Sequence, residues 1–502
     1  MISLSKQIKL GTILGYFNIL ISSIVTLVYT PFMLKMMGQS EYGLYSLVSS
    51  VIAYLSVLDM GFGNAMIRFV SRSIAKNDDN DSKLNGIFLI LYFIIGLIAL
   101  IIGIVLLCNI ELLFSKSLTP NELGTAKVLM VILFSTVAIS FPLSVFDSYI
   151  MVNERYVYLR IMSIIKSLIV PIIMIPLLLL GFKSIAMCVV VSSVNLMYHI
   201  FMLIYCFCKL KMKISFDIKT YDKKLIKEVF AYSFFVFLNI IVDNVFKNTD
   251  QIILGSVSGT IAVSVYAIAS QISNMNTQFS TIISGMFLPR ITKVNEEKNS
   301  DDIISNIFIK TSRVQLFVML LILSGFIIFG KMFINLWAGY EYIDAYYIVL
   351  LLIGPAIVPL TQNICISVLQ AKNMHQFRSI AYIILAIINV AISIPLAKMY
   401  GGIGAALGSA IATIIGQIFL MNYFYKYKAG LDIDRYWKFF FKFSIQIVLI
   451  TILFYKIFNN FEYSFIILFI GVLIYIFIYL IVVLFNTNYD ERKYIKQLLK
   501  IK

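Results

Sequence analysis

FAYSFFVFLNIIVDNVFKNTDQIILG, the stretch from Phe230 to Gly255, has the length and apolar character of a membrane-spanning helix. Four of its polar residues follow one another at spacings of four, four and three, and these spacings place them on one helical face: Asn239, Asp243, Lys247 and Asp250. One charge at the bilayer centre costs roughly 2.5–3.5 kcal/mol on insertion scales, so three charges need a polar lumen or charged partners. We interpret the stretch as a helix that lines a water-filled cavity. The alternative is a self-paired stripe in which Lys247 neutralises the two aspartates.

The composition of the whole chain points to the same environment. Hydrophobic residues make up 60% of the 502 residues, charged residues make up 13%, and the mean hydropathy is +0.93. Because a soluble domain cannot bury so large an apolar share, the sequence predicts an all-α polytopic membrane protein. The net charge of +16 is then explained by basic loops on one side of a membrane. We therefore expect that the protein has no nucleic-acid partner.

Fourteen apolar segments are long enough to cross a hydrocarbon core of about 30 Å. We expect spans at 10–34, 43–66, 86–108, 125–150, 157–180, 184–208, 230–254, 260–287, 313–334, 346–370, 378–398, 404–425, 440–458 and 463–485. The first segment lacks a small-residue cleavage pattern, so we expect a retained span there and not a signal peptide. The two termini and every second loop hold 32 Lys and Arg residues, whereas the opposite loops hold seven. This asymmetry predicts that both termini lie in the cytoplasm.

An internal repeat is also visible. A shift of 221 residues superposes Asn18 on Asn239 and Gly38 on Gly259. The same shift aligns three polar residues of the first span with the charges of the seventh: Ser22, Thr26 and Tyr29. It also aligns the polar faces of the second and eighth spans, which include Tyr45, Asp59 and Tyr266. Later in each half, Pro176 and Gly181 correspond to Pro395 and Gly401, at shifts of 219 and 220 residues.

The repeat predicts the organisation of the chain. We expect a six-helix lobe at 1–208, a cytoplasmic linker at 209–229 and a second six-helix lobe at 230–425. Two additional spans and a basic cytoplasmic tail follow at 426–502. The four polar faces would enclose a central cavity between two pseudo-symmetric lobes, and rocking of one lobe against the other would open that cavity to alternate sides of the membrane.

The passage PFMLKMMGQSEYGLYSLVSSVIAYLSVLDMGFGNAMIRFVSR, from Pro31 to Arg72, resembles the opening of the Wzx-type oligosaccharide flippases. These form the polysaccharide-transport family of the multidrug/oligosaccharidyl-lipid/polysaccharide (MOP) exporter superfamily, which includes MATE-like exporters. The resemblance rests on Pro31, on Gly38 followed by Glu41-Tyr42-Gly43, and on Leu58-Asp59-Met60-Gly61 leading to Arg68. It is strongest over the first 75 residues or so.

The resemblance implies a transporter and not an enzyme. Its substrate would be an undecaprenyl-diphosphate-linked oligosaccharide, moved from the cytoplasmic to the outer leaflet of the bacterial inner membrane for O-antigen, lipopolysaccharide or capsule assembly. The implied partners are the lipid bilayer and a polymerase and chain-length regulator of the assembly pathway, and we expect a monomer. We expect no cofactor or metal; coupling would be to H+ or Na+.

Residue roles follow from that substrate. Lys247 would act as a point-charge partner for the diphosphate. Arg68 and Arg290 would attract it at the cytoplasmic entrance, although interfacial arginines usually reach lipid headgroups. Hydrogen bonds and ring faces for the sugars would come from Asn18, Ser22, Thr26, Tyr29, Tyr45, Asn239, Tyr266, Gln271 and Asn274. For ion coupling we assign Asp243, Asp250 and Asp59; Asp59 has the alternatives of capping the local backbone or pairing with Arg68.

Other interpretations stay open. A multidrug exporter or a lipid II flippase of the same superfamily is the nearest alternative, and a membrane glycan polymerase is a more distant one because the outer loops are short. Asp147 and Lys166 lie inside the fourth and fifth spans, where we expect them to form a mutual ion pair. For the five cysteines and His199 we expect no metal role.

Overall fold

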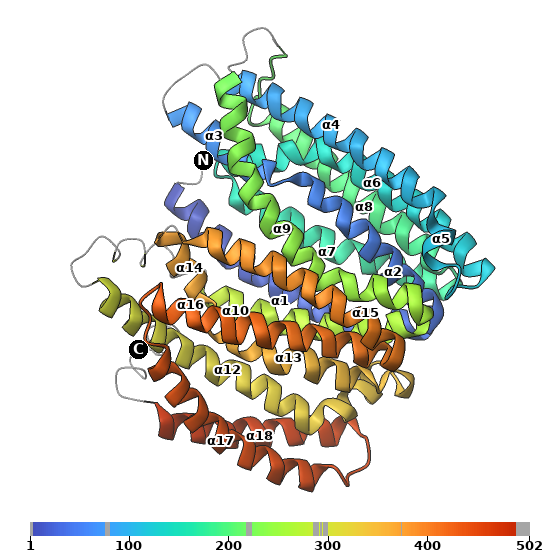
Figure 1. Ribbon diagram of the computed structural model, residues 1–502. Helices are drawn as coiled ribbons and strands as arrows, with labels where there is room; N and C mark the ends of the chain where they lie inside the picture. The colour runs from blue at the N-terminus through green and yellow to red at the C-terminus, as the bar shows by residue number, and fades with distance from the viewer. Residues whose placement is uncertain are drawn as a thin grey trace. The chain divides into compact units, whose positions relative to one another are not determined.

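The computed structural model describes residues 4–75, 81–216, 223–284, 291, 294, 300–372 and 374–487, and these residues form helices and connecting turns without a strand (Figure 1). Contacts between Cα atoms divide the chain into two compact units, Met1–Ser264 and Val265–Lys502. Each unit has its own hydrophobic core.

The N-terminal unit contains the first helices of the chain. They are α1 (Leu4–Met37), α2 (Gln39–Leu55), η1 (Ser56–Asp59), α3 (Phe62–Ala75), α4 (Asp81–Cys108), α5 (Ile110–Phe114), α6 (Pro120–Val152), α7 (Tyr156–Leu179), α8 (Ser184–Cys208) and α9 (Lys223–Val257), and the unit also includes the start of α10 (Gly259–Ser284).

Helix α6 is the centre of this unit. It packs against α4 on one side and α8 on another, while α1 runs along α7 and α9 packs on α2 and α3 (Figure 1). Phe62, Phe88, Tyr92, Val145 and Met202 belong to the buried cluster that joins these helices. α9 is the first helix of the expected second lobe, yet its contacts lie within the N-terminal unit. The lobe boundaries that follow from the repeat stay a prediction.

The first turn of α6 is fixed by a capping box, with Pro120 at the start of the helix. Thr119 Oγ1 accepts from the backbone N–H of Glu122 at 3.3 Å, and the Glu122 carboxylate accepts in return from the Thr119 N–H at 2.9 Å. The same carboxylate accepts from Ser40 at 2.6 Å and from Thr260 at 2.7 Å. One side chain therefore connects the first turns of α2, α6 and α10.

The C-terminal unit continues with the later helices. They are α12 (Ser300–Trp337), η3 (Tyr340–Tyr342), α13 (Ala345–Thr361), α14 (Ile364–Ala371), α15 (His375–Thr413), the π-helical turn η4 (Ile414–Leu420), α16 (Met421–Tyr427), α17 (Ile433–Phe458) and α18 (Phe465–Asn486).

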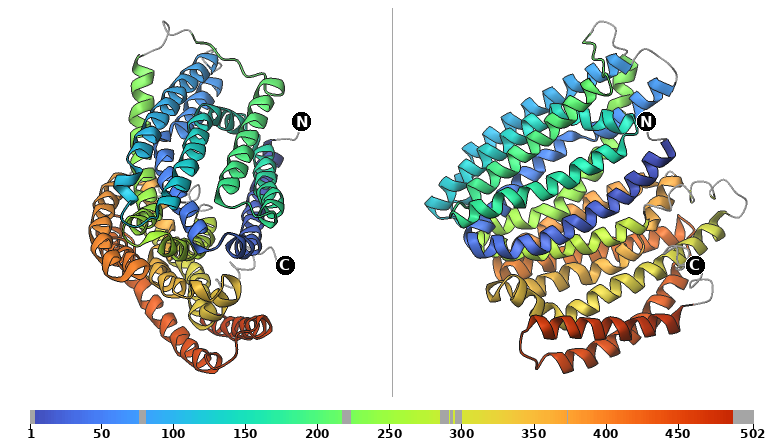
Figure 2. Two further views of the ribbon diagram at one scale, coloured as in Figure 1. Left: turned by 90° about the vertical axis from the view of Figure 1, so that its right-hand side faces the viewer. Right: turned by 180° about the vertical axis from the view of Figure 1, so that it is seen from behind.

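The long helix α12 organises this unit by packing against α13, α17 and α18. The two added spans, α17 and α18, lie side by side (Figure 2). Their apolar contacts are supplemented by buried hydrogen bonds from Tyr475 to Ser324 Oγ (2.6 Å) and from Tyr479 to the Phe317 carbonyl (2.7 Å). These hydrogen bonds fix α18 to α12, because the hydrocarbon core of the bilayer offers a tyrosine hydroxyl no water to bond with.

Among the described residues, eleven helices are long and apolar enough to cross a membrane, and the number is twelve if the pair α13–α14, bent by 45°, forms one span. One of the eleven, Gln376–Tyr427, reverses at Gly401 (φ 58°). Its two arms are antiparallel, since Asn389 contacts Ser409 at 3.3 Å and Ser393 reaches the Ala405 carbonyl at 3.4 Å. α10 forms a helix where a span is expected but falls outside those eleven. The multi-span helical fold is confirmed, and the number fourteen stays a prediction.

Left-handed glycines recur at the same places in the two halves. Gly38 (φ 80°) lies directly before α2 and Gly259 (φ 82°) is the first residue of α10, and the two are equivalent positions in the repeat. Gly181 (φ 88°) and Gly401 (φ 58°) also correspond, and each lies at the turn between the fifth and sixth spans of its half. Because only glycine adopts such angles without strain, these turns have the same backbone requirement in both halves.

Candidate functional site

The polar stripe of α9 divides into two parts. Asp250 is buried, with 3% of its surface exposed, whereas the side chains of Asp243 and Lys247 are exposed. Among the described side chains, no ion pair within 4.0 Å joins Lys247 to either aspartate. The self-paired stripe is therefore not the observed arrangement. Asn239 lies on α9, but its side chain is outside the described residues.

The buried end of the stripe belongs to a polar contact between α2 and α9. Ser50 donates to Gln251 Oε1 at 2.7 Å, and the hydroxyls of Tyr54 and Thr249 hydrogen-bond to each other. The sequence analysis missed these four residues because they neighbour the stripe without sharing its spacing. A search for polar residues facing each other on paired spans would have found Ser50 and Gln251.

A second polar line on α9 was also missed. Asn248 donates to Asn244 Oδ1 at 3.0 Å, and Asn244 donates to the Ile240 carbonyl at 3.0 Å. This spanning helix therefore presents amide groups as well as charges, which is the composition expected of a wall beside water and not beside acyl chains.

The uncharged stripe of α1 contacts neighbouring helices. Asn18 donates to Ser163 of α7 at 3.1 Å, Ser22 donates to Ser167 at 3.4 Å, and the Tyr29 hydroxyl lies 3.3 Å from the Met187 sulfur of α8. Thr26 is half-buried, as is Tyr45 on α2. The predicted sugar ligands on α1 thus also hold α1 against α7 and α8.

Asp59 lies where the second span breaks, between α2 and α3. One of its oxygens accepts from the Gly61 N–H at 3.1 Å and the other accepts from the Tyr92 hydroxyl at 2.6 Å. Backbone capping is thus present, as the first alternative anticipated, and Asp59 is held by Tyr92 instead of Arg68. The Arg68 side chain is exposed on α3, with its guanidinium 5.9 Å from the Phe69 ring centre.

On α10 the predicted ligands differ in exposure. Tyr266 is buried, with 2% of its surface exposed, Gln271 is half-buried and Asn274 is exposed. Arg290 lies outside the described residues. The part of the chain that the structure describes contains no group of three or more His, Cys, Asp or Glu side chains placed to hold a metal.

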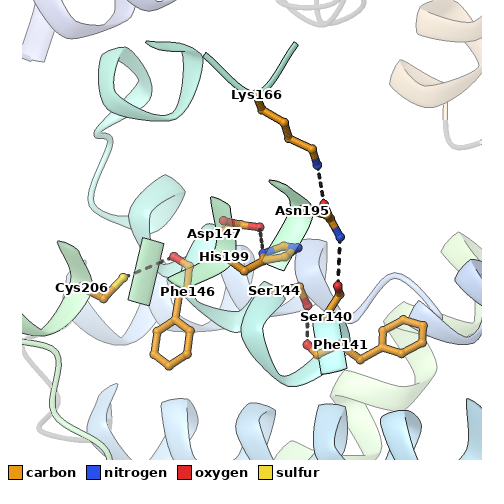
Figure 3. A network of polar contacts seen from close by, with 9 residues as sticks. All are labelled: Ser140, Phe141, Ser144, Phe146, Asp147, Lys166, Asn195, His199 and Cys206. Carbon is orange, nitrogen blue, oxygen red and sulfur yellow. Dashed lines mark hydrogen bonds and ion pairs between the residues drawn. The ribbon is translucent and has the colours of Figure 1, made fainter. Parts of the chain in front are cut away.

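The predicted ion pair between Asp147 and Lys166 is wrong (Figure 3). Lys166 instead donates to Asn195 Oδ1 at 2.5 Å, and Asp147 lies 3.2 Å from His199 Nδ1. Both new partners are on α8, which packs between α6 and α7, so each charged residue meets a residue of α8 before it can reach the other. The pairing of Asp147 with His199 was not predicted, because His199 entered the sequence predictions only as a residue without a metal role.

The geometry describes polar and charged side chains held inside a bundle of membrane spans, and comparison with known proteins gives this arrangement a context. The family model described as "Polysaccharide biosynthesis protein" matches residues 11–295, which is more than half of the chain. The chain belongs to the polysaccharide biosynthesis protein family. The chain is a multi-span membrane protein, and the relatives described next are flippases and transporters, not enzymes.

A curated relative of this family member is the "Probable low-salt glycan biosynthesis flippase Agl15" of Haloferax volcanii. It is 23% identical over 217 residues, which are 42% of this chain and 44% of the relative. The match therefore spans less than half of the relative's length.

Solved structures with a similar fold are transporters of the MOP superfamily. A lipid II flippase, MurJ, in an inward closed conformation has a TM-score of 0.70 at 19% identity, covering 94% of this chain and 97% of that structure. An inward-facing multidrug resistance MATE transporter has a TM-score of 0.62 at 14% identity, covering 80% and 93% of the two chains. At these identities the likeness establishes the fold of this family member.

Proposed function

We propose that the protein is a flippase for undecaprenyl-diphosphate-linked oligosaccharides. It would carry them from the cytoplasmic to the outer leaflet of a bacterial inner membrane by alternating access, coupled to an ion. The observation that carries the proposal is the family match over residues 11–295, in a chain whose α9 places exposed Asp243 and Lys247 within a membrane span.

The chemistry of such a substrate fits the residues. A diphosphate and sugars cannot enter hydrocarbon, so they need a wet passage, while the polyprenyl tail can stay in lipid. The Lys247 ammonium has no carboxylate partner among the described side chains, so its charge is available to a phosphate. Asn244 and Asn248, together with the predicted ligands on α1, α2 and α10, offer hydrogen bonds to hydroxyl groups.

The decisive variant is Lys247→Ala, assayed for transfer of a fluorescent lipid-linked oligosaccharide between the leaflets of proteoliposomes. Transport should be lost while the amount of inserted protein is unchanged, because the variant removes a phosphate contact and no helix contact. Lys456→Ala is the matched control, since it removes an exposed lysine from the end of α17. Full transport by Lys247→Ala would contradict the proposed role.

Ion coupling has a separate test on the same helix. We propose that deprotonated Asp243 competes with the diphosphate for Lys247, four residues away, and that protonation of Asp243 frees the lysine. Flipping by Asp243→Asn should then no longer depend on a pH gradient, whereas Asp302→Asn, a change of an exposed carboxylate at the start of α12, should leave that dependence intact. Unchanged pH dependence in Asp243→Asn would dispose of this coupling step.

The identity of the glycan can be found in cells. Deleting the gene should cause one lipid-linked intermediate to accumulate in the cytoplasmic leaflet. Accumulated lipid II would favour peptidoglycan precursor transport, the activity in the name of the similarly folded MurJ. Loss of drug resistance without an accumulated glycan lipid would favour the multidrug alternative. O-antigen or capsule assembly, with a polymerase and chain-length regulator as partners, is our proposal for the pathway.

A further inference from the structure

Three ionisable side chains from three membrane spans gather in the N-terminal unit: Asp147 of α6, Lys166 of α7 and His199 of α8 (Figure 3). Ionisable residues inside spans are costly and are retained for a purpose more often than soluble surface charges. Asp147 and His199 lie near the cytoplasmic half of the predicted topology. None of the three belongs to the α9 stripe or to the predicted substrate ligands.

Lys166 is held by neutral groups. Its ammonium donates to Asn195 Oδ1 at 2.5 Å, and Asn195 is oriented in turn by donating to Ser140 Oγ at 3.0 Å. The ammonium also lies 5.0 Å from the centre of the Tyr198 ring, a favourable position for a cation. An amide, a hydroxyl and a ring face thus surround the ammonium, and no carboxylate in the described part of the chain lies within ion-pair distance of it.

Asp147 and His199 form the second half of the cluster. Oδ2 of Asp147 is 3.2 Å from Nδ1 of His199, which is close enough for the carboxylate to stabilise a charged imidazolium. Oδ1 of Asp147 and Nδ1 of His199 are both buried and make no hydrogen bond in the described part of the chain. The fold therefore leaves polar atoms of both side chains available to a proton.

The second half of the chain has apolar residues where this cluster has Lys166, Asn195 and His199. By the shift that aligns Pro176 with Pro395, Lys166 corresponds to Leu385. By the shift that aligns Gly181 with Gly401, Asn195 and His199 correspond to Ile415 and Phe419. The second half builds the equivalent helices with apolar residues, and buried ion pairs are often replaceable by apolar residues without loss of stability.

We propose that Asp147 and His199 form a proton-binding site and that the Lys166 ammonium, where it is charged, opposes its loading. Uptake of one proton converts the neutral imidazole of His199 to imidazolium beside the Asp147 carboxylate and raises the net charge of the three groups from zero to +1. Release returns the same proton to water. The titratable and charged groups around the pair are Tyr198 and Cys206 of α8, and Tyr158, Arg160 and Lys166 of α7; on the α4 side of α6, Tyr92 interacts with Ser144.

The inference has two parts, proton binding at this site and coupling of transport to that proton. Only the second part rests on the proposed function. Proton binding itself needs no substrate. The chain has two histidines, His199 and His375, so two imidazole signals can be resolved after selective labelling. We therefore separate a binding test on purified protein from a transport test.

The binding test is nitrogen NMR of histidine-labelled protein in nanodiscs between about pH 5 and pH 8, where imidazoles change charge. His375→Gln assigns the His199 signal. That signal should change from imidazole to imidazolium as the pH falls, and Asp147→Asn should shrink the imidazolium fraction at a given pH, because the stabilising carboxylate is gone. Lys166→Leu should enlarge it. A His199 signal that is independent of pH, or is the same in wild type and Asp147→Asn, overturns the inference.

A quadruple variant guards against misfolding and tests the transport consequence. Lys166→Leu, Asn195→Ile and His199→Phe install the residues of the second half, and Asp147→Ser installs the equivalent of Ser367 so that no carboxylate is left without its partner. This variant should keep wild-type thermal stability, because the whole charged cluster is replaced and not one member of it. Its flipping should lose pH-gradient dependence although Asp243 and Lys247 are intact, because in our proposal coupling requires proton binding at both sites. Retained dependence contradicts the coupling role of the Asp147–His199 site. If wild-type protein flips no glycan lipid at all, the proposed function fails and the NMR result still decides proton binding.

Discussion

Gly43 shows how closely two helices approach in the N-terminal unit. A Cβ atom built at this position of α2 would lie 1.9 Å from the Thr260 carbonyl oxygen, at the start of α10. Backbone cannot move aside as a flexible side chain can, so this position accepts only glycine while the two helices are in contact. The sequence analysis used Gly43 as part of a motif, and the structure supplies its physical reason.

Gly43→Ala should therefore destabilise the protein by about 1–3 kcal/mol, the usual cost of overpacking. Gly124→Ala is the matched control, because a Cβ at this position of α6 would meet nothing within 4 Å. The control should be neutral or stabilising by about 0.5–1 kcal/mol, since alanine favours helix. Thermal unfolding of both variants in the same detergent measures the difference, and equal melting temperatures would contradict the close contact.

The burial and the contact partners of individual side chains were the features that the sequence predicted least well. Polar periodicity predicted the α9 stripe, but it could not separate buried Asp250 from exposed Lys247, because burial depends on which helix packs alongside. Spacing along the chain suggested that Asp147 pairs with Lys166 across a short loop. The helix that separates them, α8, directly follows α7, but the polar spacing of one helix does not show which residues of a neighbouring helix face it, so nothing local predicted His199 or Asn195 as the partners.

At the scale of the element, apolar length predicted most spans well, because a bilayer imposes nearly the same length on every crossing helix. It could not predict the hydrogen bonds that connect helix ends. Glu122 illustrates this: a Thr-x-x-Glu pattern identifies the start of α6, yet its bonds to Ser40 and Thr260 depend on tertiary packing.

Two variants separate these contributions. Thr119→Ala removes the cap and should cost about 1 kcal/mol. Glu122→Ala should cost clearly more, because it also removes the acceptor shared by Ser40 and Thr260. Chemical or thermal unfolding of both proteins supplies the comparison. Equal losses would mean that the bonds from α2 and α10 contribute nothing to stability.

At the scale of the whole molecule, the lysine and arginine asymmetry predicts the orientation in the membrane, and native cysteines can test it. Cys108 ends α4 and Cys208 ends α8, and both are exposed free thiols. With cytoplasmic termini, Cys108 lies at the outer surface and Cys208 at the inner surface. A membrane-impermeant maleimide added to intact cells should label Cys108 alone, and permeabilisation should add Cys208. Cys108→Ser and Cys208→Ser identify each signal, and the opposite order of labelling would invert the topology.

The paired glycines at Gly38 and Gly259 have a consequence for how such proteins diverge. Near these glycines the first half has uncharged polar residues where the second half has charged ones. The backbone of both halves nevertheless turns through nearly the same left-handed φ angle. The two copies of a duplicated sequence can thus diverge in their side chains while the backbone dihedral angles at the turns between their helices stay the same. Distant chains of this architecture should keep a glycine at both turns, even where no other position of the two hairpins agrees.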